Sequence, residues 1–143
     1  MRYLSIVVLL FAFVVTGSAQ TKDAILGKWV NSTGEAHLEI TKRSEKFFGK
    51  IVWLKDPKDE KGNVKTDYQN PTASLRSKPI VGLEILKNFS YDDGKWTGGN
   101  IYDPKSGKLY SCTMSLKSNG DLNMRGYIGV SLLGRTEVWK RVK

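Results

Sequence analysis

The fold is decided by one stretch, residues 95–142, with the sequence KWTGGNIYDPKSGKLYSCTMSLKSNGDLNMRGYIGVSLLGRTEVWKRV. Runs rich in β-branched and aromatic residues are separated here by two turn sequences, DPKSG at 103–107 and SNGD at 118–121. Asn119-Gly120 is the strongest turn signal, because both central residues of a type I′ turn need a positive φ, which Asn and Gly adopt at low cost. The stretch therefore predicts about four antiparallel strands that follow one another through tight turns.

Strand patterns also precede this stretch. They lie at 25–30, 35–41, 47–54 and 81–86, and apolar and polar residues alternate strictly in the second of them. Together the patterns predict an all-β domain of about eight short antiparallel strands, which can close as an up-and-down barrel or pack as a sandwich. We expect the barrel, because closure leaves no unpaired edge strand.

The N-terminus has the pattern of a secretory signal peptide. One positive charge at Arg2 precedes an apolar run at 4–15, and Gly17-Ser18-Ala19 supplies the small residues of a cleavage site. We expect cleavage after Ala19, which leaves residues 20–143 as a single domain without a transmembrane segment. The apolar run is shorter than the roughly 20 residues of a membrane span, which disfavours a retained anchor. The protein is thus predicted to be exported, either to the periplasm or outside the cell.

The chain is strongly basic. It has 23 Lys and Arg residues, 14 Asp and Glu residues and a formal charge of +9, and loss of Arg2 would leave +8. A basic exported domain is attracted to acidic surfaces such as anionic lipid headgroups, polysaccharide or cell wall. The lysines are scattered without an arginine-rich block, so we expect no nucleic-acid partner, and the charge can equally serve only to keep the surface soluble.

The residue types that catalysis or metal binding needs are scarce. Cys112 is the only cysteine, which excludes an internal disulfide, and alternation in its strand places it with Tyr110 and Met114 on the core face. His37 is the only histidine and lies on the polar face of its strand. No metal-binding or catalytic motif is present, so we expect no metal and no cofactor, and a binding protein is favoured over an enzyme.

One long connection, residues 55–79, interrupts the predicted strands. Long connections in compact domains are usually lids or binding loops. Asn70 can cap a helix and Pro71 suits its first position, so a helix of about two turns is expected at 72–78, near one rim of the barrel. Asp67, Asn70 and Arg76 are candidate lid or rim residues, with purely structural roles as the alternative.

Two ends of the chain carry a more specific pattern. Gly27-Lys28-Trp29 opens the first strand, and Arg141 ends the last. A Gly-x-Trp motif with a basic residue from the last strand packed on the indole is similar to the signature of the lipocalins and the wider calycin barrels. The resemblance implies that Trp29 plugs the closed end and that Arg141 stacks on it in a cation-π contact of roughly 0.5 to 2 kcal/mol. Arg135 is the alternative partner.

The mature chain also resembles a family of exported bacterial proteins that is defined only as a domain of unknown function. The matching stretches are GKIVW at 49–53, SLRSKPIVG at 74–82, WTGGNIYDPKSG at 96–107, RGYIG at 125–129 and SLLGRT at 131–136. Some members look lipocalin-like, and the family supplies no established catalytic residues. The second lipocalin motif is absent from its usual late position, and the chain is short for a lipocalin, so the cavity is expected to be small.

Two functions of different classes fit these observations. The first is a non-enzymatic carrier or sensor of a small, partly apolar molecule, held in the barrel mouth under the long connection. Its candidate ligand-binding residues are Trp53, Tyr102, Tyr110, Arg125, Tyr127 and Trp139. The second is a cell-envelope interaction module that acts through its basic surface and fills its interior with its own side chains. A cavity above roughly 300 Å³ favours the first function, and a packed interior favours the second.

Overall fold

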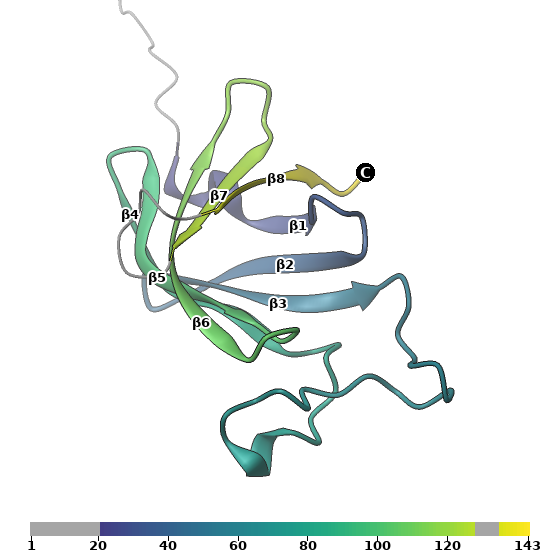
Figure 1. Cartoon of the computed structure of the whole chain (residues 1–143). Coiled ribbons are helices and arrows are strands. Elements are labelled where there is room, and N and C mark those ends of the chain that lie inside the picture. The colour runs from purple at the N-terminus through teal and green to yellow at the C-terminus, as the bar shows by residue number, and fades with distance from the viewer. Residues whose placement is uncertain (1–20, 128–134) are drawn as a thin grey trace, which may run out of the picture.

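The computed structural model describes residues 21–127 and 135–143, which form a barrel with one projecting lobe (Figure 1). The strands are β1 (Gly27–Val30), β2 (Ala36–Arg43), β3 (Lys46–Leu54), β4 (Glu84–Asp92), β5 (Lys95–Asp103), β6 (Lys108–Leu116), β7 (Leu122–Tyr127) and β8 (Arg135–Arg141). Each strand pairs antiparallel with the next, and β8 pairs with β1 to close the barrel. The predicted up-and-down barrel is confirmed, whereas the signal peptide and its cleavage site lie outside the described residues.

Alternation along the strands builds the core. In β2 the side chains of Ala36, Leu38 and Ile40 are buried, and in β6 Cys112 and Met114 are buried. The residues between them are exposed or half-buried, as a strand with one solvent-facing side requires. The alternation read from the sequence therefore assigns the inner faces of both strands correctly.

Glycines let neighbouring strands approach where large side chains fill the core. A Cβ atom at Gly49 in β3 would lie 2.7 Å from Leu86, and one at Gly99 in β5 would lie 2.5 Å from Phe89. The pairing of β3 with β4 shifts register on both sides of Gly49, as expected for a glycine at a bulge or bend. This shift accompanies burial of two successive residues of β4, Ile85 and Leu86.

One end of the barrel is closed by the N-terminal segment. A 3₁₀ helix, η1 (Lys22–Ile25), lies across that end, and Ile25 is fully buried. The indole nitrogen of Trp29 donates to the Ile25 carbonyl at 2.9 Å, and that of Trp96 donates to the Lys22 carbonyl at 3.1 Å. The indole N–H groups of two buried tryptophans therefore bind the backbone of η1, the N-terminal plug, at this end of the barrel.

The opposite end carries the β3–β4 connection, residues 55–83, which forms the lobe below the barrel in Figure 1. Two isolated bridges, Lys58 with Val64 and Thr66 with Pro79, pair the connection with itself. The expected two-turn helix is wrong, since the only helical element of the connection is the 3₁₀ turn η2 (Ala73–Leu75). This pairing leaves only a few residues at the tip of the connection that could form a helix. The Lys78 carbonyl accepts a hydrogen bond from the Asp67 amide rather than from a helical amide. None of the helices in the described ranges has the length and apolar character of a membrane span.

Candidate functional site

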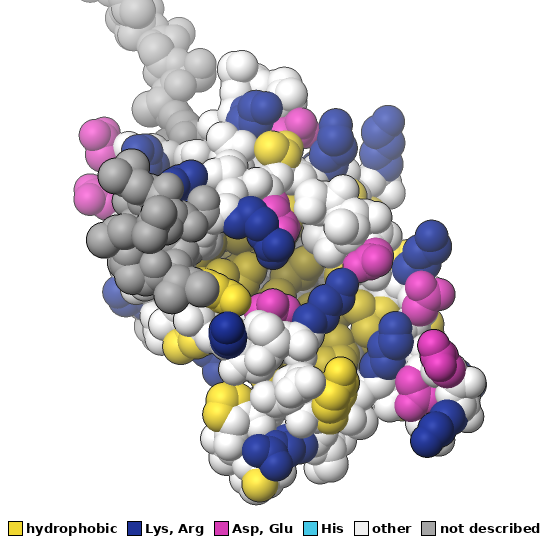
Figure 2. All heavy atoms as spheres, viewed as in Figure 1, with side chains coloured by type: hydrophobic (Ala, Val, Ile, Leu, Met, Phe, Trp, Pro, Cys, Tyr) yellow, Lys and Arg dark blue, Asp and Glu magenta, His cyan; other side chains and the backbone are white. Residues whose placement is uncertain are grey.

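A cavity of about 1130 Å³ occupies the barrel and opens beside the β3–β4 connection. Figure 2 shows it as a hollow floored by hydrophobic side chains and edged by charged ones. Its apolar lining comes from several strands and includes Ala36, Leu38, Ile51, Leu54, Ile85, Ile101, Met124 and Trp139. Val64 and Ile80 of the connection add to the lining, so the connection forms part of the cavity wall. The small cavity expected from the length of the chain is not observed.

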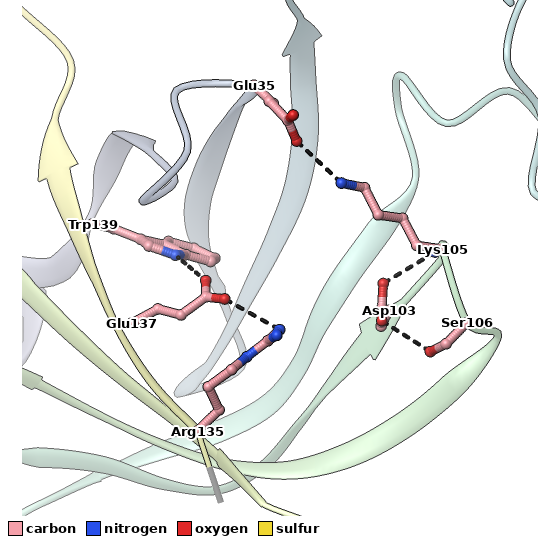
Figure 3. Close-up of polar contacts among 7 residues, drawn as sticks. All are labelled: Glu35, Asp103, Lys105, Ser106, Arg135, Glu137 and Trp139. Atoms are coloured by element: carbon pink, nitrogen blue, oxygen red, sulfur yellow. Dashed lines mark hydrogen bonds and ion pairs between the residues drawn. The ribbon is translucent and has the colours of Figure 1, made fainter.

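Strand β8 supplies an ion pair inside this lining. Arg135, Glu137 and Trp139 are two residues apart, and all three line the cavity. A guanidinium nitrogen of Arg135 lies 3.2 Å from Oε1 of Glu137, and the indole nitrogen of Trp139 donates to Oε2 at 3.3 Å (Figure 3). Each oxygen of the Glu137 carboxylate therefore has a donor or a positive charge beside it, which offsets the loss of water around a charged group in the barrel.

A second ion pair spans the mouth. Nζ of Lys105, in the β5–β6 turn, lies 3.0 Å from Oε2 of Glu35, at the end of the β1–β2 turn (Figure 3). The lysine, through its hydrogen bond and its charge, lowers the pKa of the Glu35 carboxyl group below its ordinary value. The carboxylate of Asp103 fixes the turn that carries Lys105, by accepting from the Lys105 amide at 3.0 Å and from Oγ of Ser106 at 2.9 Å.

The predicted rim residues Asp67, Asn70 and Arg76 come together where the connection meets β5. Asp67 is fully buried. One of its carboxylate oxygens accepts a hydrogen bond from the Tyr102 hydroxyl at 2.7 Å, and the other accepts from the side-chain amide of Asn70 at 2.8 Å. Nε of Arg76 donates to the Asn70 carbonyl at 2.7 Å. Burial, together with the hydrogen bond to the negatively charged Asp67, raises the pKa of the Tyr102 hydroxyl to about 12. This cluster anchors the connection to the barrel.

The glycine of the β5–β6 turn makes a second anchor possible. Gly107 has φ +71°, and a Cβ atom there would lie 2.1 Å from the Gln69 carbonyl oxygen. Any other residue would push the turn away from the connection. The close approach therefore depends on glycine at this position.

Cys112 lines the cavity as a buried thiol. Its pKa is raised to about 12, mainly by burial; a backbone hydrogen bond at Arg125 opposes this rise, and the negative charge of Glu137 adds to it. The thiol is therefore protonated at neutral pH, so it has little nucleophilic character.

Three of the candidate ligand-binding residues, Tyr102, Tyr110 and Trp139, line the cavity. Trp53 is not part of the described lining: its ring lies 4.4 Å from the ring of His37, between centroids, and its residue is 43% exposed. Its assignment to the inner wall is therefore corrected. A register shift in the β2–β3 pairing pairs Leu38 with Ile51 but His37 with Trp53, which turns Trp53 to the outer face.

Other candidates also lie away from the lining. Arg125 donates to the Thr136 hydroxyl at 2.9 Å on the neighbouring strand, an arrangement that matches its alternative role in strand pairing. The side chain of Tyr127 falls outside the described residues. Arg135, the alternative partner of Trp29, lies on the cavity lining with Glu137.

Sequence reasoning missed Glu137, Glu35 and Lys105 as site residues. The signal for Glu137 was present, because alternation from Trp139 places residues 137 and 135 on the same face. The pairing of Glu35 with Lys105 joins two turns far apart in the chain and has no local signal. No cluster of three or more His, Cys, Asp or Glu side chains suited to a metal ion occurs within 21–127 and 135–143.

The family model described as an uncharacterised protein conserved in bacteria, DUF2147, matches residues 27–141. Among solved structures, the fold is similar to that of protein HP1028 from the human pathogen Helicobacter pylori, which is described as belonging to the lipocalin family. The chains are 24% identical, the match covers 82% of each, and the TM-score is 0.72. No curated protein matches the sequence. The expected lipocalin-like fold is confirmed.

Proposed function

The chain belongs to the bacterial DUF2147 family, and we propose that it is an exported, non-enzymatic carrier or sensor that binds a small, partly apolar molecule inside its barrel. The observation that carries the proposal is the cavity of about 1130 Å³ with a largely hydrophobic wall. Binding pockets for small molecules usually start at roughly 300 Å³. An envelope module that fills its interior with its own side chains would not have this cavity.

The lining indicates an amphipathic ligand. Leu38, Ile51 and Met124 offer an apolar surface, which favours burial of hydrocarbon or aromatic groups. Arg135 and Glu137 offer one donor and one acceptor group on the same wall, and Arg135 is the more accessible of the two, with its side chain 83% exposed. We therefore place the polar group of the ligand near this ion pair and its apolar body against the facing strands.

The direct test is native mass spectrometry of the protein purified from its own host, to look for a retained small molecule. A fluorescence screen of lipids, isoprenoids and aromatic metabolites then tests binding in solution. Trp139 is the expected reporter, because its ring lines the cavity. A micromolar binder that quenches tryptophan fluorescence supports the proposal, whereas failure of every compound together with the absence of a retained molecule speaks against it.

Gly126 offers a way to block the cavity without disturbing the strand. It lines the cavity, and a Cβ atom there would meet its nearest neighbour, Ile101, at an ordinary 3.7 Å. We expect Gly126→Leu to fold and to weaken binding at least tenfold, which is about 1.4 kcal/mol. Ser111→Leu is the matched control, since it adds the same side chain on the exposed face of β6. Equal binding by both variants would place the ligand outside the barrel.

Export to the periplasm or to the cell exterior rests on the sequence of residues 1–19. The mature protein should begin at Gln20, because Gly17 and Ala19 have the spacing of a cleavage site. Intact mass measurement of the protein from the exported fraction tests this step. Retention of Met1 would argue against cleavage.

A further inference from the structure

The exposed hydrophobic residues of the described ranges gather at the open end of the barrel. They are Trp53, Val64, Tyr68, Leu75, Val81 and Leu109, with exposures between 37% and 66%. Most belong to the β3–β4 connection, whereas Trp53 lies near the end of β3 and Leu109 near the start of β6. The turns at the opposite, closed end contribute none within 21–127 and 135–143. Scattered exposed hydrophobics are ordinary, but their restriction to one end of the molecule is not.

The connection displays these side chains on a fixed backbone. The amide of Asp67 bonds to the Lys78 carbonyl at 2.8 Å, and that of Ile80 bonds to the Lys65 carbonyl at 3.0 Å. The hydrogen bond between Tyr102 and Asp67 then ties this pairing to the barrel. Because the backbone is held in this way, Tyr68 is kept 66% exposed rather than folded onto the core.

Leu109 belongs to the same neighbourhood as the connection. It pairs in register with Tyr102, whose hydroxyl reaches Asp67, the residue before Tyr68. The close approach of Gly107 to Gln69 brings the start of β6 against the connection as well. Strand β6 and the connection thus present their hydrophobic side chains at one end of the barrel.

Positive charge is interleaved with these hydrophobic residues. The connection carries exposed basic residues Lys55, Lys58, Lys61, Lys65, Arg76 and Lys78, and exposed acidic residues Asp56, Asp59 and Glu60. Asp67 is buried. The exposed charges of the connection therefore sum to +3. Figure 2 shows basic side chains beside hydrophobic ones on the lobe.

We propose that the open end of the barrel docks on an anionic lipid bilayer, through a docking face made of Tyr68 and Leu109 with Lys65 and Lys78. Protein interfaces are depleted of lysine at their centres, whereas surfaces that bind membranes combine hydrophobic and basic side chains. Anionic headgroups attract each nearby lysine, and the hydrophobic side chains enter the boundary with the acyl chains. A bilayer therefore fits this face better than a protein partner.

Docking would also place the cavity mouth at the bilayer. Lys65 and Tyr68 both line the cavity and are both exposed. An amphipathic molecule could then pass between lipid and barrel without crossing water. The docking face itself does not depend on the carrier function, because all four of its side chains are exposed to solvent and can contact lipid without a ligand in the barrel.

Sedimentation with vesicles tests the proposal on the purified protein without added ligand. We expect binding to vesicles of phosphatidylcholine and phosphatidylglycerol at 70:30 and at least tenfold weaker binding to phosphatidylcholine alone. The double variant Lys65→Glu/Lys78→Glu should weaken binding to the anionic vesicles about tenfold or more. Lys95→Glu/Lys117→Glu changes the net charge equally at the closed end and should weaken binding less than about threefold.

The hydrophobic part of the face has its own variant. Tyr68→Ser/Leu109→Ser should weaken vesicle binding about tenfold while leaving the positive charge unchanged. Equal losses of binding in the two charge variants would show that net charge alone attracts the protein to the vesicles. Unchanged binding of the serine variant would show that Tyr68 and Leu109 make no contact with lipid. Either result overturns the docking face. Absence of vesicle binding, with a dimer that the serine variant dissociates in sedimentation velocity, would assign the face to a second copy of the chain. None of these outcomes changes the ligand assays on Gly126→Leu.

Discussion

Arg141 stacks on Trp29, with its guanidinium carbon 4.1 Å from the centroid of the indole. The two residues are partners in the pairing of β1 with β8, so the contact lies at the seam where the barrel closes. The same guanidinium donates to the carbonyls of Leu26 at 2.7 Å and Ala24 at 2.8 Å. One side chain therefore joins the last strand, the first strand and the N-terminal plug.

The first prediction follows from the burial of Trp29. Its side chain is fully buried, so Trp29→Ala should lower the free energy of unfolding by about 3 to 5 kcal/mol. Trp53→Ala removes the same ring from the outer face, where it is 43% exposed, and should cost less than about 1.5 kcal/mol. Urea unfolding of both variants measures the difference. Equal losses would mean that the seam does not depend on Trp29.

The second prediction concerns the anchor of the connection. Tyr102→Phe removes the donor to one oxygen of the buried Asp67 carboxylate, which should weaken the anchor by about 1 to 3 kcal/mol. The amides of Asp67 and Ile80 should then exchange with deuterium faster, while core amides of β2 keep their protection. Tyr68→Phe is the control, since that neighbouring tyrosine is 66% exposed.

The same hydrogen bond should depend on pH. The pKa of the Tyr102 hydroxyl is raised from its ordinary value of 10.0 to about 12 in the folded protein, so folding favours its protonated form. The stabilisation is therefore complete below about pH 10 and is lost as the pH rises toward 12. We expect the difference in unfolding free energy between the wild type and Tyr102→Phe to shrink over that range. Absorbance titration should also show one phenol near pH 12 that the variant lacks.

The third prediction is that Cys112 reacts slowly with thiol reagents in the folded protein and fast after denaturation. Its side chain is buried and its pKa is raised to about 12, so both access and thiolate content are low. A time course with a colourless aromatic disulfide, in buffer and in denaturant, compares the two rates. Rapid labelling in buffer would show that the cavity wall opens at β6.

Local signals account for the parts of the fold that the sequence predicts. Asn119-Gly120 and strict alternation in β2 act over a few residues, and together they indicate antiparallel strands. Trp53 shows the limit of this reasoning, because a single register shift against β2 reverses the face of every residue beyond it. Alternation from Met124 does place Arg125 on the outer face, so the position of Arg125 could have been inferred.

Long-range pairing explains what the sequence did not reveal about the connection. Asn70 does accept from the Thr72 amide at 2.8 Å, as a capping residue would. The helix nevertheless stops after one short turn, because residues 65–67 pair with 78–80 and keep that segment extended. The partner of Asp67 is a tyrosine 35 positions away, and no local pattern indicates such a contact.

The last prediction tests whether the connection acts as a lid for the cavity. Val64, Lys65 and Tyr68 line the cavity, so removal of residues 55–79 should weaken ligand binding at least tenfold, about 1.4 kcal/mol. A short Gly-Ser turn in their place should leave the barrel folded, because Gly82 and Leu83 still bond to Ile51 and the other strand pairs do not involve the connection. Binding is measured by tryptophan quenching with a compound found in the screen.

A smaller replacement separates a lid from a general effect of loop shortening. Residues 72–75 form the tip around η2, exclude the anchoring residue Arg76 and are absent from the described cavity lining. Exchange of this tip for a Gly-Ser turn keeps Asp67 and Tyr68 in place, and it should therefore change the affinity less than about threefold. If removal of 55–79 leaves the affinity unchanged while far-UV circular dichroism shows an intact barrel, the connection is no lid. If the tip replacement weakens binding as much as the full one does, the tip rather than the wall residues contacts the ligand.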